Sequence, residues 1–282
     1  MIKFSILVPT LNRSSELARM LDSIVRNNYD EIEILLVDQN DNDIIECIIE
    51  KYDLQIKHIK SHVKGLSVNR NIGIKSARNE WIVLADDDAV FGDNYFRALA
   101  DHINQDPKID IWVSNVRNIE DHAFYTHPPT FRPNNFKIHH FKQVCSISLA
   151  IKNTVFEEIG MFDEEFGVGA KFGACEESDI VLRAFFHQFH FGRSNQCNIY
   201  HPQIKKNFTN LERVKSYSLG FGALHKKYIR IRPWREKAFF LYSFLNLLLR
   251  SSIGLVLNSF SNKRKYFYAS LIYKIKGFFQ YK

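Results

Sequence analysis

Apolar runs of the ~20 residues needed to span a bilayer and paired cysteines are both missing from this sequence. Its four cysteines lie far apart in 282 residues and form no C-x-x-C pair, so their spacing predicts a reducing compartment and no disulfide framework. The opening residues, MIKFSILVPT, lack the charged start, apolar middle and small-residue cleavage site of a signal peptide. We therefore expect the body of the protein to stay in the cytoplasm.

Acidic residues are almost absent from the last part of the chain, and this divides it electrostatically. The overall net charge of +7 combines a net −8 over residues 1–202 with a net +15 over 203–282, where Glu212 and Glu236 are the acids. Aromatic residues reach 14%, with 24 phenylalanines, which predicts exposed aromatic surface as well as a core. A basic, aromatic tail indicates a polyanionic partner, either nucleic acid or anionic lipid.

The tail favours lipid, because its basic residues alternate with long apolar runs. Residues 238–249 and 251–262 are 12 residues each without a charged side chain, and Arg250 separates them. Neither run reaches the ~20 residues needed to span a bilayer. We therefore expect residues 206–282 to form helices that lie on an anionic membrane surface. A helical packing subdomain or a dimer surface is the plainer alternative.

Apolar strands alternate with helices over the first 85 residues. Strands are expected at 3–8, 31–38, 54–60 and 81–85, and helices near 17–25, 43–52 and 66–77. Pro9 is expected to end the first strand. This alternation predicts crossover units, and hence an α/β fold with a mainly parallel sheet and helices on both faces.

The periodicity is weaker between residues 118 and 140, a stretch rich in His, Pro, Asn and Phe. Its length without a pattern indicates disorder or a functional loop. Order is expected again at 144–151, in helices near 153–159 and over 176–188, and in a strand at 198–202. A glycine-rich stretch covers 160–174.

Three adjacent carboxylates, Asp86, Asp87 and Asp88, directly follow the strand at 81–85. Ligands of open α/β sheets bind at the carboxyl ends of the strands, and neighbouring carboxylates favour a bound cation. Their oxygen atoms suit Mg²⁺ or Mn²⁺, which would also hold a diphosphate. An isolated acidic triplet is usually a solvated turn, but its place after a buried strand favours a metal site.

Two further candidates stand at the ends of elements. Asp38 ends the second strand and is placed to accept hydrogen bonds from a base or ribose, although a turn or helix cap would also explain it. The residues that follow resemble a calcium loop, but Asp43 and Ile49 stand where such a loop needs Gly and Glu. Arg70 begins a helix behind Gly65, where it can clamp a phosphate or form a surface salt bridge.

Acidic residues also open the helix at 176–188. Glu176, Glu177 and Asp179 would complement the helix dipole, yet the glycine-rich approach indicates a loop that delivers a carboxylate to a cleft. His201 follows a strand. A lone histidine is usually structural, but this one is also placed to ligate metal or contact phosphate.

Seven motifs, taken in order, resemble the motif set of family 2 glycosyltransferases. They are SILVPTLNR (5–13), LLVDQND (35–41), GLSVNRNIGI (65–74), ADDDAVF (85–91), GMFDEEFGVGA (160–170), EESDIVLR (176–183) and YHP (200–202). The segment YSLGFGALHKKY (217–228) resembles one found in polysaccharide-assembly members. Each motif alone is weak, and the specificity of the resemblance comes from their order.

This resemblance implies a GT-A fold, a three-layer α/β/α sandwich, over residues 1–205, followed by a helical basic region over 206–282. It implies an inverting transferase that uses a nucleoside diphosphate (NDP) sugar, expected to be a UDP-sugar, with Mg²⁺ or Mn²⁺ as cofactor. The implied donor-binding residues are Pro9, Thr10, Asn12, Arg13, Asp38, Gly65, Arg70, Asp86, Asp87 and His201. The implied metal ligands are Asp88, Asp87 and Asp86, which match the family's D-x-D motif.

The resemblance also assigns roles within these sets. Asp86 is implied to face the ribose and His201 the diphosphate. The catalytic base falls at Glu177, where the family usually has Asp, and Glu176 and Asp179 stay alternatives. The acceptor is expected to be a hydroxyl of a glycan or polyprenyl-linked glycan in surface polysaccharide synthesis, in a pocket shaped by 118–140 and 160–174.

Other functions fit parts of the sequence. A non-catalytic nucleotide-sugar-binding protein or membrane-associated scaffold would bind the donor without transfer, but the acidic triplet and the acidic helix favour an enzyme. A transferase that makes NDP-sugars would need a glycine-rich N-terminal loop, and VPTLNRSSE has no glycine. Nucleic acid is not an expected partner, a second copy of the chain is left open, and the expected location is the inner face of the cell membrane.

Overall fold

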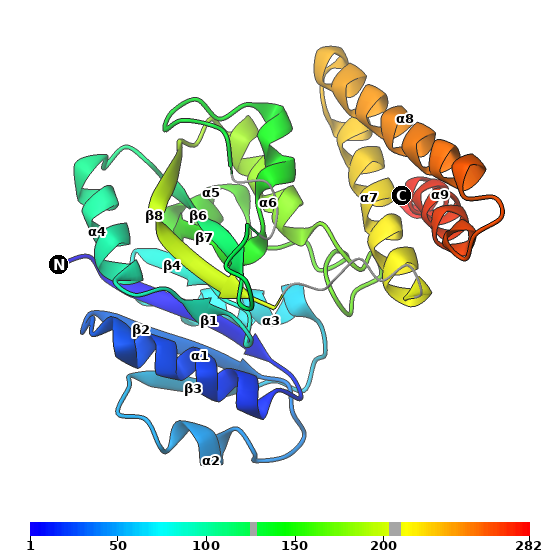
Figure 1. Ribbon diagram of the computed structural model, residues 1–282. Helices are drawn as coiled ribbons and strands as arrows, with labels where there is room; N and C mark the ends of the chain where they lie inside the picture. Colours follow the sequence, from blue (N-terminus) through cyan, green and yellow to red (C-terminus); the bar gives the residue numbers. More distant parts are fainter. Residues whose placement is uncertain (125–128, 203–209) are drawn as a thin grey trace. The chain divides into compact units, whose positions relative to one another are not determined.

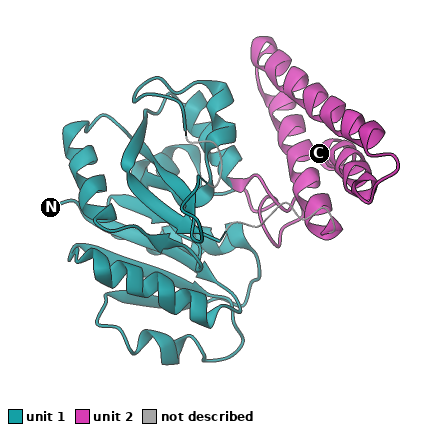
Figure 2. Ribbon diagram, viewed as in Figure 1, with its two compact units in different colours: residues 1–162, 177–203 teal, residues 163–176, 204–282 magenta. Residues whose placement is uncertain are grey.

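The computed structural model describes residues 1–124, 129–202 and 210–282 of the chain (Figure 1). It divides the chain into two compact units (Figure 2). The sheet unit comprises residues 1–162 and 177–203, and the helical unit comprises 163–176 and 204–282. The boundary that the sequence predicts, between residues 205 and 206, lies outside the described residues.

An eight-stranded mixed sheet forms the middle of the sheet unit. Its strands are β1 (Phe4–Thr10), β2 (Ile32–Asp38), β3 (Ile56–Lys60), β4 (Trp81–Leu84), β5 (Val90–Phe91), β6 (Ile111–Asn118), β7 (Leu149–Lys152) and β8 (Phe191–His201), in the order β3-β2-β1-β4-β7-β6-β8-β5. β1 pairs in parallel with β2 and β4, and β2 pairs in parallel with β3. This half of the sheet confirms the crossover pattern that the sequence predicts.

Helices cover both faces of β1, because its side chains alternate between the two faces. Phe4, Ile6 and Val8 join a buried apolar cluster with residues of α1 (Ser14–Asn27) and α4 (Tyr95–Gln105). Leu7 points to the other face, where α3 (Leu66–Ser76) packs so tightly that a Cβ on Gly73 would lie 1.9 Å from its Cδ1. The sheet is therefore the middle of three layers.

The structure corrects the limits of several predicted elements. β1 runs through Pro9, which pairs with Val37 of β2. The pairing of β1 with β4 ends at Leu7, so no ladder bond is required of Pro9, which has no N–H, on that side. The helix expected over 43–52 is one turn, α2 (Glu46–Ile49), and β8 begins seven residues before the expected strand at 198–202.

The stretch between β6 and β7 is largely irregular, as the sequence predicts for 118–140, over the part of it that is described. Short 3-10 turns at Ile138–Gln143 and Ser146–Ser148 lead into β7. Two helices then follow as expected, α5 (Asn153–Ile159) and α6 (Glu176–Phe186).

The helical unit contains α7 (Leu211–Ile231), α8 (Trp234–Leu257) and α9 (Lys263–Gln280). Glycines allow α7 and α9 to touch backbone to backbone. A Cβ on Gly222 would lie 2.0 Å from the carbonyl oxygen of Lys274, and a Cβ on Gly277 would lie 2.0 Å from that of Leu219. Any side chain at either position would therefore push the two helices apart.

The glycine-rich segment 163–176 packs within the helical unit. Phe166 and Phe172 are fully buried, and the ring of Tyr281 lies 5.9 and 5.8 Å from theirs, respectively. Lys227 of α7 forms an ion pair with Asp163 at 2.7 Å. The segment is therefore held by contacts to α7 and to the end of the chain beyond α9, and its structure depends on them.

Helix α8 joins the two apolar runs of the tail into one helix of 24 residues that passes through Arg250. Among the described residues, this helix is long and apolar enough, by length and composition alone, to cross a membrane. Phe240, Phe244 and Gly254 are buried on one of its faces, whereas its outward face stays exposed. The helix is thus apolar on two sides.

Candidate active site

The acidic triplet lies in the turn that follows β4, at the carboxyl edge of the parallel strands. The N–H of Ala85 donates to the carbonyl of Leu7 at 3.0 Å. This hydrogen bond keeps the chain beside β1 up to the residue before the triplet. Asp87 and Asp88 are buried, and Asp86 is half-buried. The three carboxylates therefore belong to the interior of the site rather than to a solvated turn.

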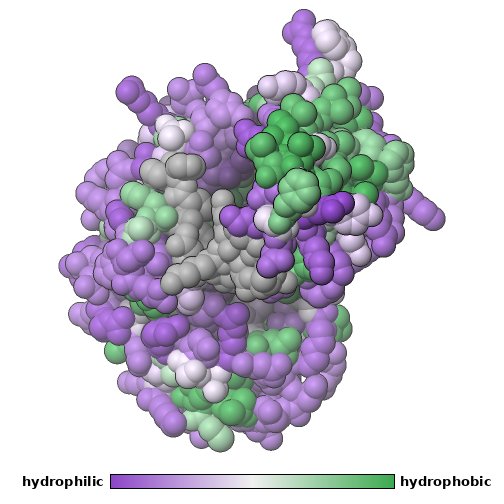
Figure 3. All heavy atoms as spheres, turned by 45° about the vertical axis from the view of Figure 1, so that its right-hand side comes forward, coloured by the Kyte–Doolittle hydropathy of each residue, from purple (hydrophilic) through white to green (hydrophobic). Residues whose placement is uncertain are grey.

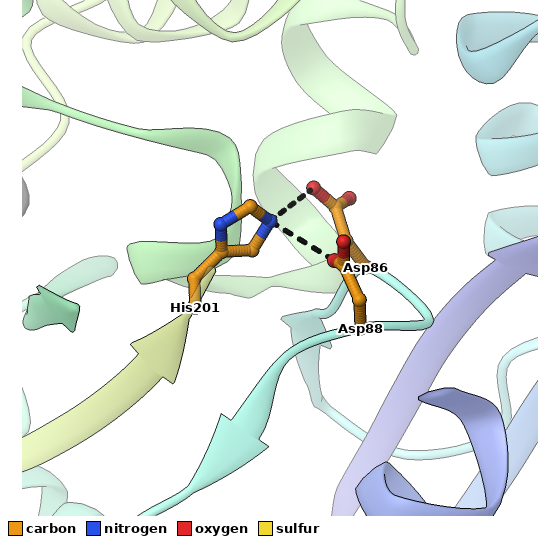
Figure 4. A group of neighbouring side chains, drawn as sticks. All are labelled: Asp86, Asp88 and His201. Atoms are coloured by element: carbon orange, nitrogen blue, oxygen red, sulfur yellow. Dashed lines mark ion pairs between the residues drawn. The ribbon is translucent and has the colours of Figure 1, made fainter. Parts of the chain in front are cut away.

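Asp86, Asp88 and His201 converge from two distant parts of the chain (Figure 4). One potential ligand atom from each lies within 4.8 Å of the others. His201, the last residue of β8, places its Nε2 2.9 Å from Asp88 Oδ1 and 4.0 Å from Asp86 Oδ2. The parallel register between β6 and β8 brings the end of β8 to this edge.

These three side chains fit a divalent cation. The Nδ1 of His201 lies 2.9 Å from the carbonyl oxygen of Pro202, which can only accept, so this contact favours the tautomer with the proton on Nδ1. In that tautomer Nε2 would face the two aspartates with its lone pair, as in a metal-ligating histidine. Two carboxylate oxygens and one imidazole nitrogen are ligands that suit Mn²⁺, and the oxygens also suit Mg²⁺.

Asp87 is directed away from this cluster toward the end of β1. Its Oδ2 accepts a hydrogen bond from Thr10 Oγ1 at 2.9 Å and one from the backbone N–H of Leu11 at 3.3 Å. Burial raises the pKa of Asp87 to about 6, against the opposing effect of the Arg13 charge and of these hydrogen bonds. Asp87 thus fixes the loop after β1 to the triplet. The sequence had predicted Asp87 as a metal ligand.

Two arginines balance the negative charge of the triplet. Arg13 forms ion pairs with Asp87 and Asp88, the former at 3.5 Å. Arg70 is fully buried, and its Nη2 donates to Asp86 Oδ1 at 2.9 Å. Its guanidinium also lies 5.5 Å from the ring of Phe162. Both cations are therefore in position to meet a phosphate beside the carboxylates.

The position of Arg70 follows from how α3 begins and packs. Gly65 precedes the helix with a φ of 138°, a backbone conformation that favours glycine. Its N–H donates to Gln39 Oε1 at 2.9 Å, which fixes the start of the helix beside the end of β2. The close approach of Gly73 to β1 then buries the helix face that carries Arg70.

Asp38 is the centre of a second polar cluster, at the end of β2. It is fully buried and accepts two hydrogen bonds from Asn40, at 2.8 and 2.7 Å. His58 and Lys60 of β3 lie 3.0 and 3.1 Å from its Oδ2. Burial alone would raise the pKa of Asp38, but these hydrogen bonds outweigh it and lower the pKa.

Sequence reasoning missed the partners of Asp38. Gln39 and Asn40 are buried, and Asn40 also accepts a 2.7 Å hydrogen bond from the backbone N–H of Asn12. This contact joins the loop after β1 to the loop after β2. The polar run that was compared with a calcium loop contained the signal, because a polar residue next to a strand end tends to satisfy the backbone there.

The first turn of α6 separates the three candidate bases by their surroundings. Asp179 is fully buried and accepts a 2.9 Å hydrogen bond from Arg183 Nε. Arg183 in turn donates to the carbonyls of Ile159, Gly160 and Met161. Asp179 therefore stabilises the end of α5. Glu176 is also buried, whereas Glu177 is half-buried and accepts from Ser178 Oγ at 3.0 Å.

The structure thus brings most of the predicted donor-site residues to one edge of the sheet. Contacts join Thr10 and Arg13 to Asp87, Arg70 to Asp86, Asn12 to Asn40, and Gly65 to Gln39. Pro9 lies in β1 one residue before Thr10. Glu177 and Asp179 belong to the sheet unit, and Glu176 falls in the helical unit, at the junction between the two. The roles assigned to these residues stay predictions.

Comparison with known proteins shows what this arrangement is similar to. The family model described as "Glycosyl transferase family 2" matches residues 5–161, more than half of the chain. An uncharacterized glycosyltransferase of Haemophilus influenzae is 22% identical over 186 residues, which cover 64% of this chain and 60% of that protein. A GalNAc(5)-diNAcBac-PP-undecaprenol beta-1,3-glucosyltransferase of Campylobacter jejuni is 31% identical over 93 residues, 31% of this chain and 30% of that protein.

Solved structures share the fold. TarS 1-349 of Staphylococcus aureus in complex with UDP-GlcNAc matches with a TM-score of 0.68 and 16% identity, over 99% of this chain and 81% of TarS 1-349. The mannosyltransferase PcManGT of Pyrobaculum calidifontis, in complex with GDP-Man and Mn²⁺, matches with a TM-score of 0.62 and 16% identity, over 97% and 87%. These likenesses confirm the predicted GT-A fold.

Proposed function

The chain belongs to glycosyl transferase family 2, and from this premise we propose that it transfers a sugar from an NDP-sugar to a hydroxyl with inversion at the anomeric carbon. The observation that carries the proposal is the convergence of Asp86, Asp88 and His201 at the carboxyl edge of the sheet. Side chains from the turn after β4 and from the end of β8 meet there with ligand atoms within 4.8 Å of one another. Buried cationic and anionic groups in one place indicate a site built for a charged ligand.

Asp86, Asp88 and His201 would hold a divalent cation, Mg²⁺ or Mn²⁺, next to the diphosphate of the donor. When bound, such a cation offsets the negative charge that grows on the departing nucleoside diphosphate. Arg70 and Arg13 would add positive charge on the same side, since both contact the aspartates already. Thr10 and Asp38, at the paired ends of β1 and β2, would contact the nucleoside.

We assign the catalytic base to Glu177. Inversion requires the acceptor oxygen to attack the anomeric carbon opposite the leaving group, and a carboxylate has to take the hydroxyl proton during the attack. Asp179 is committed to Arg183, and its burial leaves it no route to an incoming hydroxyl. Glu177 is the least buried of the three acids in this turn.

The donor and acceptor follow from chemistry and from the relatives. UDP-GlcNAc in the TarS complex and GDP-Man in the PcManGT complex are nucleotide sugars, and we propose a UDP-sugar for this chain. The Campylobacter jejuni relative is named for an undecaprenol-linked acceptor. A glycan on a polyprenyl carrier, used in cell-surface polysaccharide synthesis, is accordingly the proposed acceptor, at the cytoplasmic side of the cell membrane.

A donor screen tests the proposal. The full chain is incubated with UDP-, GDP- and TDP-sugars in Mn²⁺, Mg²⁺ or EDTA, and release of the nucleoside diphosphate is measured. We expect metal-dependent release from one nucleotide class, and transfer when a polyprenyl-linked glycan is added. Donor binding without release or transfer under any condition would favour the non-catalytic nucleotide-sugar-binding or scaffold function instead.

A further inference from the structure

The outward face of α8 carries an exposed apolar stripe along the whole helix. The stripe consists of Trp234, Leu241, Leu245, Leu249, Ile253, Val256 and Phe260, the last just beyond the helix end, and each is at least 47% exposed. Most of them recur every three or four residues, which places them on one side of an α-helix. In Figure 3 apolar atoms gather over the helical unit. A surface of this kind marks an interaction site.

Basic side chains surround this stripe. Arg235 and Lys237 are exposed in the first turn of α8, and Arg250 is exposed near its middle. Residues 263–265, the sequence KRK, are exposed where α9 begins. Over the whole of 211–282 the acids are Glu212 and Glu236, and both already pair with basic neighbours. The partner of the stripe therefore has to accept both apolar side chains and positive charge.

We propose that the stripe docks α8 in the plane of an anionic lipid bilayer. A lipid surface supplies both features at once, because the acyl chains receive the apolar side chains and the headgroups receive the surrounding cations. The helix, about 36 Å long at 1.5 Å per residue, would lie along the interface with its stripe toward the acyl chains. The inference concerns the helical unit alone and does not depend on the proposed chemistry.

Two other orientations fit the structure less well. If α8 spanned the bilayer, α7 and α9, which pack on its inner face, would enter the bilayer with it. This would place the buried Lys274 and the exposed Lys276 of α9 among the acyl chains. A second copy of the chain would place two equally basic surfaces against each other, which repel. In a symmetric antiparallel pair of α8 helices the two Arg250 side chains would approach near the centre.

Trp234 provides a direct reporter of docking. It is 74% exposed, whereas Trp81 and Trp112 are buried in the sheet unit. The full chain is mixed with vesicles of phosphatidylcholine alone, or with phosphatidylglycerol added, and with brominated lipids. We expect a blue shift and bromine quenching of Trp234 fluorescence that require the anionic lipid and weaken with salt. Trp234→Phe should remove both signals.

Paired variants test the stripe itself. Leu245→Glu with Leu249→Glu should weaken binding to anionic vesicles roughly tenfold or more, because charge replaces two inserted side chains. Val25→Glu, at an exposed apolar residue of α1 in the sheet unit, is the matched control and should bind as the parent does. Lys263→Gln with Arg264→Gln and Lys265→Gln should reduce the dependence on phosphatidylglycerol while the helix content stays unchanged.

Donor hydrolysis is measured in parallel without vesicles and should be the same in all of these variants, so that failure of docking and failure of the proposed chemistry are distinguished. Equal binding of the parent and the double Glu variant to anionic vesicles would overturn the proposal. A parent that ignores vesicles but is a dimer in solution, and that the double Glu variant converts to a monomer, would assign the stripe to a second copy instead.

Discussion

The two units bury charge in different ways. In the sheet unit the buried charges face opposite charges: Arg70 meets Asp86, Asp88 meets Arg13, and Asp38 meets Lys60. In the helical unit the buried Lys274 donates to two neutral hydroxyls, those of Ser251 and Ser270, at 2.8 and 2.9 Å. Paired charges hold a site in position for a charged ligand, whereas a cation among hydroxyls only weakens the fold around it.

The largest effect is expected where paired charge would hold the cation. Asp88→Asn keeps the shape of the side chain but removes its charge, so sugar transfer should fall on the order of 10⁴-fold. Calorimetric titration with the NDP-sugar, with and without Mn²⁺, should show that the metal no longer strengthens donor binding. Asp53→Asn, an exposed acid of the same unit, is the control. Unchanged metal-dependent binding in Asp88→Asn would remove this residue from the cation site.

The second effect separates chemistry from structure within one helical turn. Glu177→Gln should lower turnover on the order of 10³-fold, since a general base is lost, while donor affinity and melting temperature stay the same. Asp179→Asn should instead lower the melting temperature, because it weakens the hold of Arg183 on the end of α5. If Glu177→Gln turns over like the parent, the base assignment is wrong.

The third effect compares two tight glycine contacts, one in each unit. A Cβ on Gly277 would meet the backbone oxygen of Leu219, which cannot rotate away, and Gly277→Ala should destabilise the helical unit by about 3 kcal/mol. A Cβ on Gly73 would meet the end of the Leu7 side chain, which can change rotamer, so Gly73→Ala should cost the sheet unit about 1 kcal/mol. Urea unfolding measures both losses, with the fluorescence of the buried Trp81 and Trp112 following the sheet unit and circular dichroism following the whole chain. Equal losses would contradict the difference in packing.

The smallest effect concerns Lys274, the cation that is buried among hydroxyls, without an opposite charge from the part of the chain that the structure describes. Burial lowers the pKa of Lys274 from 10.5 to about 8. Because the folded-state pKa is the lower one, the helical unit should gain stability as pH rises from about 8 to 10.5 and lose none of it above that range. Lys274→Met should stabilise the unit by about 1 kcal/mol at pH 7 and abolish this pH dependence. A variant with the same slope as the parent in urea unfolding at pH 7 and pH 10 would place the cause elsewhere.

Local pattern predicted the parallel half of the sheet because each strand and helix between Phe4 and Leu84 carries its own periodicity. The same logic found the triplet, since a polar run after an apolar strand marks the edge of a sheet. It could not find that His58 and Lys60 hold Asp38, because these contacts depend on the register of β2 with β3. The tail was read as two runs broken by Arg250, but a charge on the exposed side of a helix does not end it.

Residues 160–174 were expected to shape the acceptor pocket, and the packing of the segment 163–176 could not be predicted from the local sequence. The contacts of Phe172 with Tyr281 and of Gly173 with Ser216 join residues far apart in the chain. Nothing in a glycine-rich motif indicates which helix will cover it. Such pairings are properties of the folded chain rather than of the motif.

The packing of segment 163–176 also decides what can be removed from this protein. The chain leaves the sheet unit after Phe162, enters it again at Glu177, and leaves it once more after Gln203. Ending the protein at residue 205 would therefore expose Phe166 and Phe172. The segment 163–176, directly before the proposed base Glu177, would lose the helices it packs against. The helical unit therefore cannot be removed without exposing this segment. Loss of Tyr281 alone would remove one of the rings that pack on Phe166 and Phe172.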